Sequence, residues 1–327
     1  MAADKRFAHV MAITLDPRTQ YREGAIRCVT SREGDVTVGG NIDKSELHTA
    51  VAGSLENFEI GEKVNMKDEA EIISSLKEEG LDFIGMEDPD IWIDERNDEM
   101  HLYFTLPFIN RVDSYQNIIH LGHAVGKNLN SLRMTTPALL ADAQGGAKEL
   151  SVAPINSKGV RLNLVESSME EYDRTYSVVR LAIAQDMGRP WKFGEIVFHP
   201  KEQKTSWIGG HASPGPLLPE SFIDLGEGKR LGLMNGRGAD QIINGKFSVG
   251  KFSVGLFIYD YEYGKIDWVS PVPFIQDSEA KAMTFASQFV ETGDGEGILY
   301  AHVDDSFVRA YTLEAELLTL MLAADSL

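Results

Sequence analysis

Four strongly apolar segments recur along the chain, and their spacing limits the folds that it can adopt. They are centred on Tyr103, Leu164, Leu233 and Tyr300, at intervals of about 60–70 residues. Each follows an apolar or Pro-containing strand and a turn rich in Gly, Asp or Asn, and a weaker unit at residues 25–42 precedes them. Five such units predict an all-β fold, a five-bladed β-propeller whose sheets bury their faces against one another.

The same spacing predicts a single propeller domain over residues 1–327. A β-sandwich would need fewer and more evenly spaced strands. To close the ring, residues 7–14 (FAHVMAIT) are expected to add a strand to the last blade. Two amphipathic patterns, at residues 68–79 and 313–324, predict a short helix and a C-terminal helix.

The formal net charge of −19 argues against a nucleic-acid partner, because no Lys or Arg residues form a run. A neutral ligand such as a carbohydrate fits better. No apolar run reaches the roughly 18 residues that span a bilayer, and no signal-peptide pattern is present, so we expect a cytoplasmic protein without a membrane partner. A homo-oligomer is left open.

Residues 85–93 (GMEDPDIWI) contain the best catalytic candidate. Asp88 lies between Glu87 and Pro89 at the start of a strand, where a like-charged neighbour and partial burial raise the pKa of a carboxyl group toward that of a general acid. The alternative is that Asp-Pro simply begins a turn. Glu87 is expected to contact the substrate.

A stiff segment at residues 208–219 (IGGHASPGPLLP) predicts a ligand-binding loop that presents His211 and Ser213, with Trp207 beside it as a platform for a sugar ring. The alternative is a connection between blades with His211 in a structural hydrogen bond. The strand that follows, residues 229–237, brings Asn235 and Arg237 to one end, where both are expected to hold the sugar together with His211 and Ser213.

The last strong strand ends in two carboxylates, of which Asp305 could bind sugar hydroxyls unless both belong only to the turn. His120 and His123 lack a nearby carboxylate or Cys set, so no metal site is predicted. Nucleotide-binding glycine motifs and the Gly-x-Ser-x-Gly elbow are absent, so no cofactor is expected.

Three segments in this order resemble glycoside hydrolase family 130, the five-bladed propellers that phosphorolyse or hydrolyse β-mannosides. Residues 85–91 are similar to its Glu-Asp-Pro-Arg signature, residues 213–218 (SPGPLL) to its Gly-Pro-Pro-Pro-Ile loop, and residues 285–306 to its closing blade. The resemblance implies that Asp88 is the proton donor and that Asp305 contacts the sugar.

The departures from the family pattern bear on the mechanism. Asp90 stands where the family has the Arg of its signature, and Asn235 stands where it has a His. In residues 147–166, where Lys148 is expected to bind the substrate, the Arg that would help to hold phosphate is replaced by Glu166.

A carboxylate in that position disfavours phosphorolysis and suits the base of an inverting hydrolase. We therefore predict a glycoside hydrolase acting on a β-mannoside or related glycan, with Glu166 as base and Glu149 and Glu220 as rivals. The alternatives are a propeller that only binds a glycan and a phosphorylase of the same family.

Overall fold

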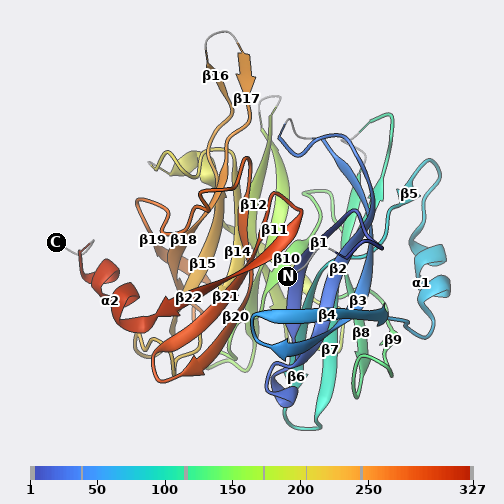
Figure 1. The fold of residues 1–327 in the computed structure, drawn as a ribbon, viewed down its shortest axis with the longest axis horizontal. Coiled ribbons are helices and arrows are strands. Elements are labelled where there is room, and N and C mark those ends of the chain that lie inside the picture. Colours follow the sequence, from blue (N-terminus) through green and yellow to red (C-terminus); the bar gives the residue numbers. More distant parts are fainter. Residues whose placement is uncertain are drawn as a thin grey trace.

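The structure, a computed structural model, describes residues 4–37, 40–113, 117–171, 174–203, 205–243 and 246–324. Strands dominate it and helices are few (Figure 1). The prediction of a mostly β protein is therefore confirmed.

The first two sheets come from the first 134 residues. The first contains β1 (His9–Leu15), β2 (Glu23–Glu33), β3 (Ile42–Ser54) and β4 (Asn57–Lys63) in that spatial order. The second contains β5 (Asp82–Phe83), β6 (Glu87–Asp94), β7 (Glu99–Ile109), β8 (Ile118–Gly126) and β9 (Arg133–Met134). In the second sheet β6, β7, β8 and β9 run antiparallel in chain order.

A long sheet follows, made of two antiparallel series. The first series contains β10 (Lys148–Ser151), β11 (Arg161–Glu171), β12 (Arg174–Ala184) and β13 (Lys192–Phe198). The second contains β14 (His211–Leu217), β15 (Lys229–Arg237), β18 (Phe252–Asp260) and β19 (Lys265–Val269). A single parallel pair, Ser177 with His211, joins the two series. The separate hairpin β16 (Gln241–Ile243) and β17 (Lys246–Ser248) projects from the body (Figure 1).

The last sheet contains β20 (Thr284–Gly293), β21 (Glu296–Val303) and β22 (Phe307–Glu314). Two α-helices are present among the described residues, α1 (Glu69–Leu76) and α2 (Ala315–Ala324). Both lie where the amphipathic patterns predicted them. The four strong sequence segments form β7, β11, β15 and β21, each of which is paired on both sides.

The five antiparallel series of the described chain pack in a closed order. Their first strands, β1, β6, β10, β14 and β20, contact one another in succession, and β20 contacts β1. An apolar core fills each seam, with these representative pairs: Leu47 and Phe104, Leu121 and Val165, Val179 and Phe257, Leu233 and Leu299, Ile13 and Val290. Burying each of these side chains contributes about 1.5–3 kcal/mol.

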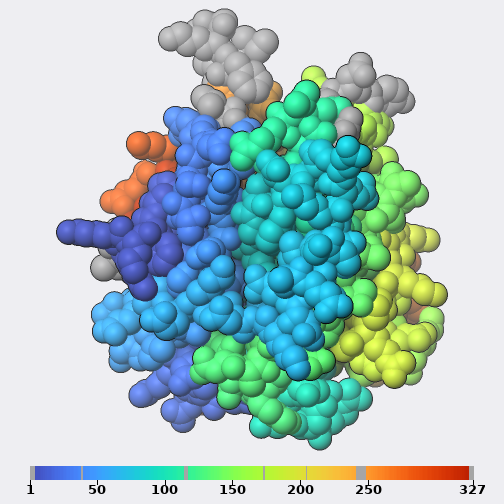
Figure 2. Space-filling view, turned by 90° about the vertical axis from the view of Figure 1, so that its right-hand side faces the viewer, coloured from blue at the N-terminus to red at the C-terminus, as the bar shows by residue number. Residues whose placement is uncertain are grey.

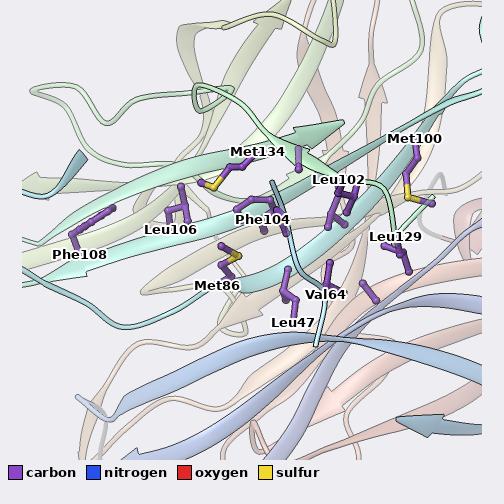
Figure 3. Close-up of a cluster of buried hydrophobic side chains, with 14 of the residues drawn as sticks. Leu47, Val64, Met86, Met100, Leu102, Phe104, Leu106, Phe108, Leu129 and Met134 are labelled. Carbon is purple, nitrogen blue, oxygen red and sulfur yellow. The ribbon is translucent and has the colours of Figure 1, made fainter. Parts of the chain in front are cut away.

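The seam between the first and second sheets shows how this packing works. Leu47 of β3 faces Phe104 and Leu106 of β7, with Met86 between the sheets (Figure 3). On the surface, the blue N-terminal sheet and the cyan segments that follow it lie side by side (Figure 2). The two sheets therefore share one apolar core, and the start of β6 lies where they meet.

The prediction that residues 7–14 complete the last sheet is wrong. β1 pairs antiparallel with β2 and so begins the first sheet. It approaches the last sheet mainly through side-chain packing, with one backbone hydrogen bond from Val10 N to Ser306 O. The contact between β1 and the last sheet is therefore largely apolar.

Candidate functional site

The first strands of the series begin around one pocket of about 460 Å³. Because these strands contact one another in a closed order, the residues with which they start come together. The pocket is lined by Glu87 and Asp88 from β6, Lys148 and Glu149 from β10, and His211 from β14. Residues from segments far apart in the sequence thus form one charged surface.

Seven of the ten predicted site residues line this pocket: Glu87, Asp88, Lys148, Glu166, His211, Arg237 and Asp305. The other three do not. Trp207 is buried between strands, where its Nε1 donates to Ser270 O at 3.0 Å and its ring fills the space left by Gly236 and Gly255. Its predicted role as a sugar platform is therefore wrong.

Asn235 and Ser213 are fully buried, so their predicted contact with a sugar is also wrong. The Asn235 side chain donates to Ala286 O at 3.1 Å and accepts from Ala286 N at 2.7 Å, which ties β15 to β20. The Ser213 hydroxyl lies beside Glu166 and helps to stabilise its charge. Glu220, a rival for the base, pairs with Arg230 at 2.6 Å outside the pocket.

A buried arginine that the sequence analysis missed holds the acidic pair at the start of β6. Arg27 of β2 donates from Nη1 to Asp88 Oδ1 at 2.9 Å and from Nη2 to Glu87 Oε1 at 2.6 Å. Its sequence signal is an arginine inside the apolar run of residues 25–29 (AIRCV). A charge there must find a partner, because an unpaired buried charge is strongly unfavourable. Asp90, which stands where the family signature has its Arg, does not line the pocket. The guanidinium group of the pocket beside Asp88 comes instead from Arg27.

The backbone around Glu87 and Asp88 is fixed by β3. Ser45 N donates to Ile84 O, and Met86 N donates to Ser45 O. Gly85 lies so close that a Cβ would be 1.9 Å from Ser45 O, and its φ of +119° favours glycine. Asp88 itself has a φ of 47°, and such strain is typical of functional sites.

Glu149 of β10 is a carboxyl group of the pocket that lies beside Asp88. Burial, followed by the charges of Asp88 and Glu166, raises the pKa of Glu149 well above its usual range, and its side chain is hydrogen-bonded to Asp88. Burial also raises the pKa of Glu87 to about 7, although Arg27 opposes the shift. Glu149 therefore favours its protonated form beside Asp88.

The pKa of Glu166 is shifted in the opposite direction from that of Glu149. Its carboxylate is 1% exposed, and Oε1 lies 2.9 Å from His211 Nε2 and 3.2 Å from Lys148 Nζ. Burial would raise the pKa of Glu166, but His211 and Lys148 outweigh it and hold the pKa far below its usual range. Glu166 is therefore an anion throughout the neutral range.

The cationic side chains of the pocket all have acidic partners. Arg27 is paired with Glu87 and Asp88, Lys148 with Glu166, and Arg237 with Asp240 at 2.7 Å. Among the described lining residues, six carboxyl groups (Asp43, Glu87, Asp88, Glu149, Glu166, Asp305) face these three cations. The pocket thus offers no unpaired arginine or lysine to a dianion.

Asp305 lies in the turn after β21, and it lines the pocket. Its Oδ1 is 2.9 Å from His302 Nδ1. Burial would raise the pKa of Asp305, but this contact outweighs burial and the pKa is lowered.

In the described part of the chain, no three His, Cys, Asp or Glu residues are arranged to hold a metal ion. No helix in the described ranges is long and apolar enough to cross a membrane.

Comparison with solved structures finds this fold in carbohydrate-active enzymes. A β-1,2-mannobiose phosphorylase from Listeria innocua matches with a TM-score of 0.65 at 11% identity, covering 99% of this chain and 95% of that chain. A structure from work on GH130 hydrolases that target β-1,2 mannosidic linkages in Candida mannan gives 0.64 at 17%, covering 94% and 85%. A glycosyl hydrolase from Bacteroides ovatus gives 0.63 at 18%, covering 95% and 85%.

These identities establish likeness of fold. The matches include a structure from work on glycoside hydrolase family 130, the family that the sequence motifs resemble, so the fold expected from that resemblance is found. Comparison with models of protein families and with curated proteins gives no match.

Proposed function

We propose that this protein is an inverting glycoside hydrolase that acts on a β-mannoside or a related glycan. The observation that carries the proposal is the contrast between two carboxyl groups that line one pocket: the pKa of Glu149 is raised, whereas that of Glu166 is lowered beside His211 and Lys148. A pair of carboxyl groups with separated pKa values is the basis of general acid and base catalysis.

In this mechanism the Asp88–Glu149 pair protonates the leaving oxygen as the bond between that oxygen and the anomeric carbon breaks. Glu166 removes a proton from a water molecule, whose oxygen forms the new bond to the anomeric carbon from the opposite face. Asp88 was predicted as the acid on its own, whereas the arrangement favours the pair. Glu149, first considered as a rival base, suits the acid because it holds a proton at neutral pH.

Water is favoured over phosphate as the nucleophile. Phosphate needs unpaired cationic groups, whereas the described arginine and lysine side chains of this pocket are all bound to carboxylates. His211 is no free cation either, because its Nε2 lies 2.9 Å from Glu166 Oε1 and burial lowers its pKa.

We also propose that the five antiparallel series are the blades of a single five-bladed β-propeller domain. The closed order of contacts among β1, β6, β10, β14 and β20 supports this, as does an apolar core at each seam. The axis of such a propeller would pass through the pocket, which is where β-propellers commonly form sites.

The test is to incubate the protein with β-mannobioses and other disaccharides, with and without phosphate, and to follow the products by NMR. Release of free α-mannose without phosphate is the expected result, because inversion converts a β-linkage into an α-product. A requirement for phosphate would identify a phosphorylase, and binding without product would identify a glycan-binding propeller.

Two variants assign the chemistry. Glu166→Gln is expected to lower kcat about 10²–10⁴-fold, the range that general base catalysis contributes. Glu220→Gln is the matched control, since Glu220 is an exposed carboxylate outside the pocket. If both variants kept the wild-type rate, Glu166 would not be the base.

A further inference from the structure

Arg27 is the most completely bound cation of the pocket. Besides its bonds to Asp88 and Glu87, its Nε donates to Ser45 Oγ at 3.0 Å. The residue is 6% exposed. All three nitrogens of the guanidinium group are therefore engaged, which fixes its plane.

The anchor of Arg27 is the same residue that fixes the chain before β6. Ser45 binds Arg27 through its side chain, and its backbone binds both Ile84 and Met86. Because Gly85 permits this close approach, the position of Glu87 and Asp88 is set by β2 and β3 together. The first sheet thus controls the geometry of an acidic pair that belongs to the second sheet.

The charges around the Asp88–Glu149 pair come from six strands or turns. They are Arg27 on β2, Asp43 on β3, Glu87 on β6, Lys148 on β10, Glu166 on β11 and Asp305 after β21. Lys148 lies beside Glu166, and Arg27 is the cation in direct contact with Asp88. Removing Arg27 would therefore leave Asp88 among carboxyl groups without its own counter-ion.

We propose that Arg27 is a positioning residue that holds Asp88 as an anion beside Glu149, so that the proton donated to the leaving group is kept on Glu149. This role rests on the proposed function. The guanidinium fork holds one oxygen of each carboxylate, Asp88 Oδ1 and Glu87 Oε1. The side chain of Glu149 contacts the same Asp88 carboxylate.

A titration that needs no substrate tests this role. The side-chain carboxyl carbons are labelled with ¹³C, and the Asp88 signal, assigned through Asp88→Asn, is followed against pH by NMR. In Arg27→Gln, the midpoint for Asp88 is expected to rise by about one to three pH units, because an opposite charge at this distance lowers a carboxyl pKa by that amount. An unchanged midpoint would overturn the proposal.

The matched control is Arg180→Gln. Arg180 is also a buried arginine paired with a carboxylate, Asp142 at 3.1 Å, but it does not line the pocket. This variant is expected to lose stability and to keep the wild-type titration of Asp88. If it shifted the midpoint as much as Arg27→Gln, the effect would be general loosening of the structure and the proposal would fail.

The pH dependence of kcat/KM gives the second readout. Arg27→Gln is expected to move the alkaline limb to higher pH, because the pair holds its last proton more tightly without the cation. Arg27→Lys keeps the positive charge but loses the two parallel N–H donors of the guanidinium group. The alkaline limb of the kcat/KM profile should therefore stay in place, while kcat falls about 10-fold or more at unchanged KM. A wild-type kcat in Arg27→Lys would contradict the positioning role even if Arg27→Gln did not fold.

The two proposals fail in different ways. If the wild-type protein cleaves no glycoside, the proposed function is wrong, and the carboxyl titration still decides whether Arg27 sets the charge of Asp88. If cleavage occurs with an unshifted titration and an unshifted alkaline limb in Arg27→Gln, the function stands and the role of Arg27 is wrong.

Discussion

Lys148 Nζ lies 3.2 Å from Glu166 Oε1, across a pair of residues that stand opposite each other in β10 and β11. The ammonium group is one of two neighbours that keep the buried carboxylate ionised, the other being His211. The state of the candidate base is therefore set by a cross-strand ion pair, and this pair can be removed by a single substitution.

Lys148→Met is expected to move the acidic limb of the kcat/KM profile to higher pH. The native pKa of Glu166 is depressed, so the base is ionised in the wild type down to low pH, and loss of the cation raises that pKa. The pH profile measured on a mannoside substrate checks this. Lys148→Arg is the control that retains the charge, and an acidic limb that stayed in place in Lys148→Met would exclude Lys148 from this role.

Asp88→Asn and Glu149→Gln are each expected to lower kcat about 10²–10⁴-fold on a disaccharide. Because the two carboxyl groups are in contact and are proposed to act as one acid, the double variant should be little worse than either single variant. A nitrophenyl glycoside, whose leaving group needs less protonation, should lose less activity. Fully additive losses in a double-mutant cycle would show that the two carboxyl groups act separately.

Gly85→Ala is expected to lower the free energy of unfolding by about 1–3 kcal/mol, because its Cβ would meet Ser45 O and its φ is unfavourable for alanine. Gly293→Ala is the matched control, since no atom lies within 4 Å of its Cβ. Denaturant unfolding of the two variants measures the difference. Equal stabilities would mean that the chain before β6 can move away from Ser45 at little cost.

Asn235→Ala is expected to destabilise the protein by about 1–3 kcal/mol, because it leaves the Ala286 N–H and C=O without their partners. Its KM should match that of the wild type, since Asn235 does not line the pocket. Unfolding measurements and steady-state kinetics separate the two effects. A raised KM at unchanged stability would restore the predicted contact with the sugar.

Several candidate site residues share one pocket because that pocket lies where strands begin. The acidic pair at Glu87 and Asp88, Lys148 and His211 all stand at the start of strands that a repeat analysis can locate. Their spacing places each in an equivalent position of a repeated unit. Equivalent positions meet when the units close into a ring, so seven of the ten predicted residues share one pocket.

What the sequence determined by itself is the mostly β fold, the two helices and the segments that carry the site, because these follow from local periodicity and turn residues. Tertiary structure decided which polar side chains face the pocket and which are buried as structural links, as Asn235 shows. It also decided the partner of Asp88, since Arg27 lies 61 residues away in another sheet. Local sequence cannot specify such contacts, because they depend on how the sheets pack and on which buried charge must be neutralised.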